Sequence, residues 1–562
     1  MARLSSKTRA HLLAVVIVTA LFELIMYALR GFELFSLPYV FSVALLLESL
    51  LVILIIHELF FSLQTPLSIA WSLILSAWEG MMGNPWITSV KKKYPRFSYW
   101  LHRRFLRNNA TGIFLTIGII ISLILVYSFL KLTQDIVLHD SLVKADERIL
   151  KLMPLIRTAS ESSFFSFITF LANWQSLVFI TLSSITLFLI KRQRFPVLLM
   201  LFAVLSTQGI SSLIKIIVGR IRPDPAMGIL SEVSYSFPSG HTLMATVVFG
   251  LISYYAIRSV KNTFPKILIA LSTMVVIFFV GLSRIYLGVH YPSDVLGSLV
   301  LGAFLLNAFV TISLLQERYH LLSIAKTPLM NRGLFALPVL LLLFSLVLHG
   351  RLISLHDEAA AKEHPVVVHE LSAEMIEKLP HYSEGLTGNA MEPISFIVAA
   401  TPEKLQRLFL DHSWYQADAA NLSNTLRAVS VAFRNEQYLT GPVTPVFMNG
   451  KPHDIAFEQP TAADTFRQRH HIRFWKTELV LEDGRNVWVA TASLDQDVKF
   501  TDTYKLPTHR IDPNIDGERD YIVTSLELSN APRVRVVEAQ LGQNAAGDSF
   551  FTDGRAILVD VK

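Results

Sequence analysis

The chain has 562 residues, of which 52% are hydrophobic, and a formal net charge of +6. Its mean hydropathy of +0.46 excludes an ordinary soluble protein and favours a bundle of membrane-spanning helices. The sequence contains no cysteine, which excludes disulfides, thiol catalysis and cysteine-bound metals. The surplus positive charge lies in loops between apolar segments, where it indicates membrane topology rather than nucleic-acid binding.

Apolar stretches of about 20 residues, long enough to cross a bilayer, recur through residues 1–350. We predict nine spans, the last of them short: 11–29, 38–62, 112–131, 167–190, 195–218, 241–258, 267–287, 294–316 and 334–349. Basic residues cluster at alternate connections, and the positive-inside rule places these connections in the cytoplasm together with the N-terminus. Nine spans then place residues 350–562 in the periplasm.

Two connections between the predicted spans carry patterns of their own. Residues 63–111 are rich in tryptophan and basic residues, which is typical of an amphipathic segment at the lipid interface, although an ordinary packed loop fits equally well. Residues 132–165 contain apolar side chains at helical spacing from Asp146 to Ile156. We expect this second segment to lie flat beside the mouth of a site.

Three short polar motifs stand at the ends of predicted spans on the outer side. Charged side chains in such positions are candidates for function in a membrane protein. The motifs are Lys215-x₆-Arg222-Pro223, Pro238-Ser239-Gly240-His241 and Ser283-Arg284-x₅-His290-x₃-Asp294. Together they supply three cations, two imidazoles and one carboxylate, a set suited to hydrolysing a phosphate ester without a metal.

The first two motifs are expected to hold an anion. Lys215 and Arg222 are seven residues apart, which places them on one face of a helix that Pro223 would end. Alone, such a pair is more often two snorkelling basic residues. Ser239 and Gly240 directly precede a span, where backbone N–H groups and the positive end of the helix dipole meet. Ser239 is equally suited to a plain N-cap.

The third motif is expected to hold a reactive histidine. Arg284 ends one span and Asp294 begins the next, with Pro292 suited to the first helical turn. His290 therefore lies on a short loop, where Asp294 can fix its tautomer and stabilise its charged form. An isolated histidine is more often structural than catalytic, but the carboxylate partner reverses that expectation here. His241, at the start of a span, can hydrogen-bond the bridging oxygen of an ester.

In order and spacing the three motifs resemble the signature blocks of the type 2 phosphatidic acid phosphatase (PAP2) superfamily, over about residues 112–316. The resemblance implies a six-helix membrane core and a two-step reaction without a metal or cofactor. It implies that His290 attacks phosphorus and forms a phosphohistidine, that Asp294 orients its ring, and that His241 acts as acid and then as base. The residues that would bind the phosphate are Lys215, Arg222, Ser239, Gly240 and Arg284.

Residues 350–562 lack a spanning run and contain short β-rich segments, which predicts a soluble α+β domain. A helix is expected from Thr401, with Thr401 as N-cap and Pro402 at the first position. Strands are expected at 394–399, 429–433, 455–457, 472–475, 487–491, 521–526, 534–537 and 557–561. Blocks such as Asp454-Ile-Ala-Phe-Glu-Gln-Pro and His470-His471-Ile-Arg-Phe-Trp475 resemble the LssY-type C-terminal domain, which is often fused to phosphatases of the PAP2 superfamily.

His453, His470 and His471 raise the hypothesis of a metal site in this domain. We disfavour it, because adjacent residues of a strand point to opposite faces, so that His470 and His471 cannot easily share one ion.

The predicted architecture is an all-α polytopic membrane core of about nine transmembrane helices followed by a soluble α+β domain. Its four parts are two N-terminal transmembrane helices with an interfacial cytoplasmic segment (1–111), a six-helix membrane phosphatase core (112–316), a cytoplasmic loop with the ninth helix (317–349) and an extracytoplasmic LssY-like domain (350–562).

The function expected from the motifs and the resemblance is hydrolysis of a lipid phosphate or pyrophosphate at the periplasmic face of the inner membrane. The expected partners are the lipid substrate, the bilayer and an envelope component for the C-terminal domain, but no nucleic acid. Three alternatives stay open. The same site could pass the phosphoryl group to another lipid, it could bind vanadate as in haloperoxidases, or the protein could bind or transport lipids.

Overall fold

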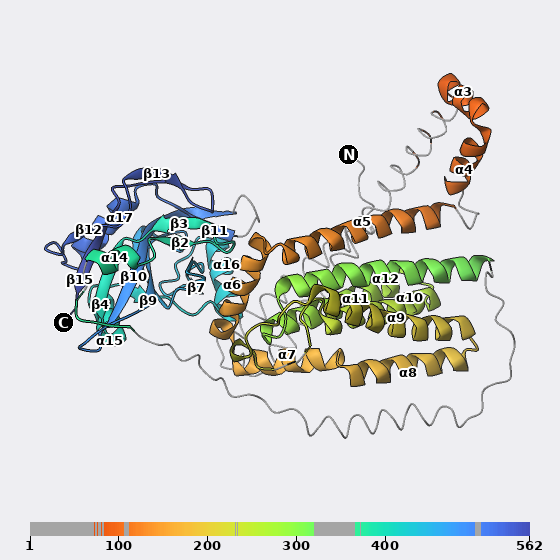
Figure 1. Cartoon of the computed structure of the whole chain (residues 1–562), viewed down its shortest axis with the longest axis horizontal. Coiled ribbons are helices and arrows are strands. Elements are labelled where there is room, and N and C mark those ends of the chain that lie inside the picture. Colours follow the sequence, from red (N-terminus) through yellow and green to blue (C-terminus); the bar gives the residue numbers. More distant parts are fainter. Residues whose placement is uncertain are drawn as a thin grey trace, which may run out of the picture.

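The structure is a computed structural model that describes residues 84–105, 112–230, 232, 234–319, 366–370, 373–500 and 507–561, with isolated positions 72, 76 and 80. It contains a bundle of long helices and a β-rich domain, which meet end to end (Figure 1). The predicted spans at 11–29, 38–62 and 334–349 lie outside the described residues. The total of nine spans therefore stays a prediction.

The bundle begins with α5 (Ile113–Val137) and continues, after a helix outside it, with α7 (Ala159–Leu171), α8 (Trp174–Ile190), α9 (Arg194–Val218), α10 (Gly240–Ser259), α11 (Thr263–Tyr286) and α12 (Pro292–Tyr319). Five of these, α5, α9, α10, α11 and α12, are long and apolar enough to cross a membrane. Where the sequence predicts one span at 167–190, α7 and α8 meet at a bend of 47° and would make a sixth span only as a pair.

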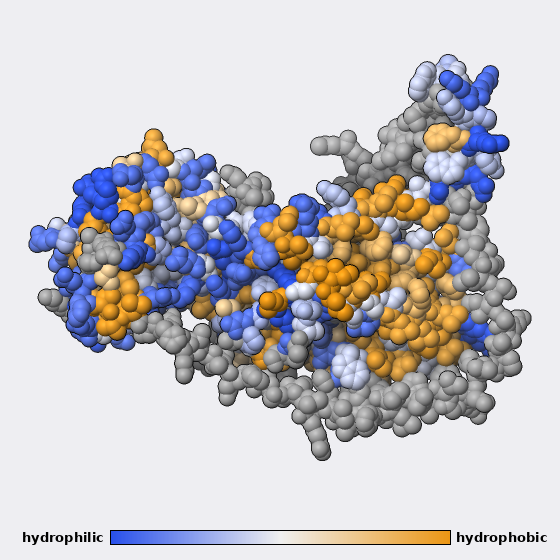
Figure 2. Space-filling model, in the orientation of Figure 1, coloured by the Kyte–Doolittle hydropathy of each residue, from blue (hydrophilic) through white to orange (hydrophobic). Residues whose placement is uncertain are grey.

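Helix α10 lies at the centre of the bundle, against α9, α11 and α12. Its side chains Leu243, Val247 and Leu251 are fully buried, whereas apolar side chains cover the outside of the bundle (Figure 2). Because lipid is as apolar as leucine, such helices associate through close packing of small residues. Gly302 of α12 is one of them, since a Cβ at this position would lie 2.7 Å from the Thr246 side chain.

The described part of the tryptophan-rich segment is helical. It comprises α3 (Pro85–Lys93) and α4 (Pro95–Phe105). Trp86 and Trp100 are exposed, and the Arg104 guanidinium lies 4.9 Å from the Trp100 ring centroid. Exposed aromatic and basic side chains on short helices are typical of a segment at the lipid interface. The location of this segment at a membrane surface stays a prediction.

Helix α6 (Ser141–Ile156) lies between the bundle and the β-rich domain (Figure 1). The Asp140 side chain accepts a hydrogen bond from the Ser141 backbone N–H at 2.6 Å and so caps the helix. The helical spacing predicted within residues 132–165 is confirmed. Across the domain boundary, Arg148 Nη2 lies 2.5 Å from Glu384 Oε2. The buried residues of α6 are Ala145, Asp146, Arg148 and Leu150.

The C-terminal domain is built around a nine-stranded sheet in the order β12-β15-β4-β10-β9-β8-β5, with β1 beside β9 and β11 beside β10. The strands of this sheet are β1 (Val366–Val368), β4 (Phe396–Ala400), β5 (Tyr415–Gln416), β8 (Ile455–Thr465), β9 (Gln468–Leu481), β10 (Asn486–Phe500), β11 (Pro507–Ile511), β12 (Arg533–Arg535) and β15 (Arg555–Asp560). Two small sheets comprise β2 (Tyr382–Glu384), β3 (Ala390–Pro393), β6 (Phe447–Met448) and β7 (Lys451–Pro452), and β13 (Gln540–Gln543) with β14 (Ser549–Thr552).

Both faces of the large sheet are buried. Because side chains alternate along a strand, neighbouring residues pack on opposite faces. Phe474 and Trp488 pack in the core beneath α15 (Pro402–Leu410) and α17 (Ile515–Ser525). Trp475 and Val489, their neighbours in sequence, pack on the other face with α14 (Ala373–Lys378). A sheet with helices packed on both faces agrees with the predicted α+β class.

The same alternation separates the paired histidines. His470 Nδ1 lies 2.8 Å from Glu518 Oε2, whereas His471 Nε2 lies 2.8 Å from Ser493 Oγ on the opposite face. This confirms that the two rings do not point to one site. Within the described residues no group of three or more histidines and acidic residues is arranged to hold a metal ion.

One predicted strand, at 429–433, is wrong, since it belongs to α16 (Leu422–Arg434). The Asn421 side chain caps this helix by accepting from the Asn424 backbone N–H at 2.8 Å. Asn435 ends it with a left-handed backbone at φ 55°. Favourable residues at both ends therefore outweigh the β propensity of the local valines.

A second predicted strand, at 521–526, is also wrong, because residues up to Ser525 belong to α17. Asn514 caps this helix by accepting from the Gly517 backbone N–H at 2.9 Å. The helix expected from Thr401 is confirmed as α15, with the Thr401 side chain accepting from the Lys404 backbone N–H. Local capping thus decides the structure at all three helices.

Candidate active site

The two cations of the first motif meet at a serine side chain and do not share a helix face. Helix α9 ends at Val218, and Gly219 follows with a left-handed backbone at φ 61°. The prediction that Lys215 and Arg222 share one helical face is therefore wrong, because Arg222 lies beyond the helix. The two cations still meet, since Lys215 Nζ lies 3.1 Å and Arg222 Nη2 2.9 Å from Ser234 Oγ.

The second motif lies at the start of α10, as predicted. Ser239 is fully buried at the N-cap position, but its side chain makes no capping hydrogen bond and its Oγ lies 3.1 Å from Thr242 Oγ1. The alternative of a plain side-chain N-cap is therefore wrong. A Cβ added to Gly240 would meet no described atom within 4 Å. The helix terminus thus faces open space, where its backbone N–H groups can meet an anion.

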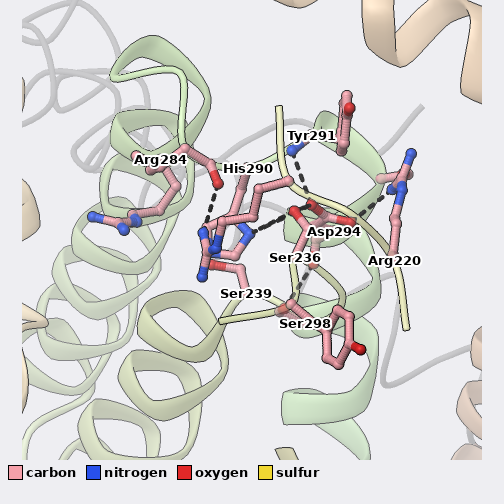
Figure 3. A network of polar contacts seen from close by, with 12 residues as sticks. Arg220, Ser236, Ser239, Arg284, His290, Tyr291, Asp294 and Ser298 are labelled. Atoms are coloured by element: carbon pink, nitrogen blue, oxygen red, sulfur yellow. Dashed lines mark hydrogen bonds and ion pairs between the residues drawn. The ribbon is translucent and has the colours of Figure 1, made fainter. Parts of the chain in front are cut away.

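The third motif places His290 on the loop between α11 and α12, as predicted (Figure 3). His290 Nδ1 lies 3.4 Å from Asp294 Oδ2, and its Nε2 lies 3.2 Å from Arg222 Nη1. Burial lowers the pKa of His290 to about 4, against the opposing effect of Asp294. The imidazole is therefore neutral at pH 7, with one nitrogen toward a carboxylate and the other toward a cation.

The break between α7 and α8 positions the other histidine. His241 Nε2 lies 2.8 Å from Oδ1 of Asn173, which lies in that break. Arg284 Nη1 donates to Thr169 Oγ1 in the last turns of α7 at 2.7 Å. The bend in the predicted span at 167–190 therefore supplies one polar partner each to His241 and Arg284.

Sequence reasoning missed the carboxylate at the centre of the site. Glu232 Oε2 lies 2.6 Å from Arg222 Nη2, and its other oxygen accepts from Arg284 and lies 4.0 Å from His241 Nδ1. Burial alone would raise the pKa of Glu232, but Arg284, His241, His290 and Arg222 outweigh it and lower the pKa to about 2. Nothing in the local sequence marks Glu232, because only the folded loop brings it among these cations.

The motifs in the sequence also did not include Arg220, which the structure places next to Asp294. Arg220 Nη1 donates to Asp294 Oδ1 at 2.6 Å, and its Nη2 donates to Asp146 Oδ2 of α6 at 2.7 Å. Asp146 Oδ1 in turn accepts from the Ser293 backbone N–H at 2.9 Å. Asp294 also accepts from the Ser236 hydroxyl. In the sequence, Arg220 was marked only by its position two residues before Arg222.

The structure therefore brings the predicted residues together. Lys215 and Arg222 meet at Ser234, Arg222 touches His290, and Arg284 and His241 are joined to Arg222 through Glu232. The Ser239 backbone N–H reaches the Asp294 carbonyl at 3.4 Å. Three cations around one carboxylate make a site that suits a tetrahedral oxyanion.

We expect Glu232→Gln to bind inorganic phosphate about tenfold more tightly, which corresponds to about 1.4 kcal/mol. The reason is that Glu232 competes with an added anion for Arg222 and Arg284. Isothermal titration calorimetry on the detergent-solubilised protein measures the Kd. Asp224→Asn, an exposed acid of the same loop, is the matched control and should change the Kd less than twofold. Equal tightening in both variants, or weaker binding by Glu232→Gln, would contradict the competition.

Comparisons with known proteins identify the family of each part of the chain. Residues 196–318 match the family described as PAP2 superfamily, and residues 376–556 match the LssY C-terminus. Phosphatidylglycerophosphatase B of Bacillus subtilis is 34% identical over 171 residues, which are 30% of this chain and 83% of that protein. Lipid A 1-phosphatase of Rhizobium johnstonii is 32% identical over 120 residues, or 19% of this chain and 45% of that protein.

Among solved structures, a transmembrane PAP2 type phosphatidylglycerolphosphate phosphatase from Bacillus subtilis is similar to this chain. It is 30% identical, the match covers 35% of this chain and 98% of the other, and the TM-score is 0.32. The two family matches confirm both resemblances predicted from the sequence, and the relatives named above are phosphatases of lipids. The chain belongs to the PAP2 superfamily and carries an LssY-type C-terminal domain.

Proposed function

We propose that the protein hydrolyses a lipid phosphate or pyrophosphate through a phosphohistidine on His290, without a metal. The relatives support the lipid phosphatase class. The observation that carries the chemistry is the orientation of His290, whose Nδ1 is directed to Asp294 while Nε2 lies beside Arg222. A carboxylate at Nδ1 favours the tautomer with its proton on that nitrogen, which leaves Nε2 as a nucleophile.

Two steps account for hydrolysis. In the first, His290 Nε2 attacks phosphorus, the P–O bond to the lipid breaks, and protonated His241 donates its proton to the leaving oxygen. In the second, His241 removes a proton from a water molecule whose oxygen attacks phosphorus, the P–N bond breaks and inorganic phosphate leaves. Asp294 is a positioning residue in both steps, since it holds the ring and touches no reacting atom.

The phosphate oxygens would be bound by Lys215, Arg222 and Arg284 together with the backbone N–H of Gly240 and with that of Ser239, once the latter leaves the Asp294 carbonyl. These donors compensate the charge that a metal supplies in other phosphatases. Glu232 occupies two of the three cations in the structure. Substrate binding therefore requires the Glu232 carboxylate to be displaced by the phosphate.

The periplasmic orientation is part of the proposal. The basic loops at alternate connections favour a cytoplasmic N-terminus in the inner membrane. The C-terminal domain contacts α6, which also bonds the catalytic end of the bundle, so both belong on one side. That side is the periplasm if all nine predicted spans form. No observation supports the envelope partner expected for this domain.

Phosphate release by the purified protein tests the proposed reaction. We expect one class among lipid phosphates and pyrophosphates to release inorganic phosphate in the presence of chelator, and His290→Ala to lower the rate by at least about 1000-fold. Loss of activity with chelator would contradict metal independence. A phosphorylated acceptor lipid in place of free phosphate would establish phosphoryl transfer instead, and activity retained by His290→Ala would refute the nucleophile.

The lowered pKa of His290 predicts the acid limb of the reaction. Since the folded pKa of about 4 lies below the ordinary 6.5, the neutral nucleophile persists as the pH falls through 6.5 and is lost only near 4. The measurement is kcat/KM against pH, corrected for the ionisation of the substrate phosphate near pH 6. If the corrected kcat/KM instead falls as the pH drops through about 6.5, His290 is not held neutral by burial.

Asp146 is predicted to be a positioning residue. We expect Asp146→Asn to lower kcat about 10–100-fold with KM changed less than twofold, because Asp146 contacts Arg220 and Ser293 but not the phosphate site. Glu147→Gln, the exposed neighbour on the same helix, is the control and should leave both constants unchanged. A rise in KM alone would instead assign Asp146 to substrate binding.

A further inference from the structure

A buried arginine in the C-terminal domain lacks a bonded partner. Arg473 of β9 is only 7% exposed. Its Nε has no hydrogen-bond partner, and no hydrogen bond or ion pair joins its guanidinium to any other residue that the structure describes. Burial lowers its pKa, and Asp495 and Glu392 oppose this only through space. A buried cation is stable only when it is paired, so Arg473 requires a partner other than the residues that the structure describes.

Asp495, the acid with the largest charge effect on Arg473, is already shared by other groups. Its Oδ2 lies 3.4 Å from Arg469 Nε and 3.2 Å from His509 Nδ1, and its Oδ1 lies 3.2 Å from His471 Nδ1. Asp495 is therefore not available as the dedicated counter-ion of Arg473.

Two further buried acids act on Arg473 only through space. Burial raises the pKa of Glu392, whose Oε1 accepts from Asn544 at 2.6 Å. Burial also raises the pKa of Glu458 to about 8, although Arg469 lies 2.6 Å away. Each of these two acids has a bonded partner of its own, Asn544 for Glu392 and Arg469 for Glu458, and neither is bonded to Arg473.

Arg473 lines a cavity of about 340 Å³ between the sheet and α6. This volume is typical of small-molecule sites and exceeds what one oxyanion fills. Ser493, Asp495 and His509 share its polar end with Arg473. Its apolar wall contains Ile149 and Leu152 of α6 and Leu386, Val446 and Phe447 of the C-terminal domain.

We propose that this cavity is a second binding site, which takes an anionic amphiphile with its charged head on Arg473 and its aliphatic chain against Ile149 and Leu152 of α6. The anion supplies the bonded partner that the guanidinium lacks, and the chain covers apolar side chains at the domain boundary. A carboxylate and a phosphate head both meet the charge requirement. The site uses no residue of the phosphatase reaction and does not depend on it.

Photo-crosslinking of the full-length protein in neutral detergent tests the site. The probes are three alkyl chains of equal length that carry a diazirine and end in a carboxylate, a phosphate or an uncharged hydroxyl. We expect adducts in α6 and in residues 385–392 with one or both anionic probes, at least fivefold above the uncharged probe. Labelling by the carboxylate alone or by the phosphate alone identifies the source of the head group and supports the proposal.

Arg473→Met should reduce the anionic adducts at least fivefold, and Arg535→Met, an exposed arginine with Glu538 as partner, should not reduce them. Because a change at a buried arginine can impair folding, Leu386→Asp on the cavity wall is the second variant, with the thermal unfolding of each variant recorded. A folded Leu386→Asp protein should lose the adducts while Arg473 is intact. Equal labelling by all three probes, or adducts that persist in both variants, would overturn the proposal.

Discussion

The catalytic end of the bundle depends on the neutralisation of one carboxylate. Asp294 is fully buried at the start of α12, and a charge in such surroundings is stable only when it is paired and hydrogen-bonded. It accepts from Arg220 at 2.6 Å, from the Tyr291 backbone N–H at 2.9 Å and from Ser236 (Figure 3). These partners come from the loop between α9 and α10 and from the loop between α11 and α12. The pairing of Asp294 therefore fixes both loops and the ring of His290.

The pairing continues from Asp294 into the second domain. Arg220 joins Asp294 to Asp146 of α6, and two residues further along α6 Arg148 pairs with Glu384 of the C-terminal domain. A single turn of α6 is therefore paired with the candidate site through Asp146 and with the C-terminal domain through Arg148. Helix α6 therefore joins the LssY-type domain to the candidate site, because a shift of α6 would disturb both ion pairs.

Two buried cationic clusters in this protein are balanced in different ways. In the membrane site the Glu232 carboxylate bonds Arg222 and Arg284 and stands where a phosphate would bind. In the C-terminal domain Arg473 faces a cavity without any bonded carboxylate among the described residues. In the membrane site, Glu232 pairs with the arginines until another anion displaces it. In the C-terminal domain, Arg473 is paired only when a ligand is bound.

The sequence by itself determined the helices of the membrane core and the motifs at their ends, because long apolar runs have one stable conformation in lipid and polar residues stay at its borders. It also determined α15 through the local cap at Thr401. It misplaced Arg222 on a helix, which ends earlier, at Val218 before Gly219, and it missed Glu232 and Arg220. Only the tertiary structure decided the positions of Glu232 and Arg220, because the charge pairs that hold them join residues distant in sequence, which local spacing does not encode.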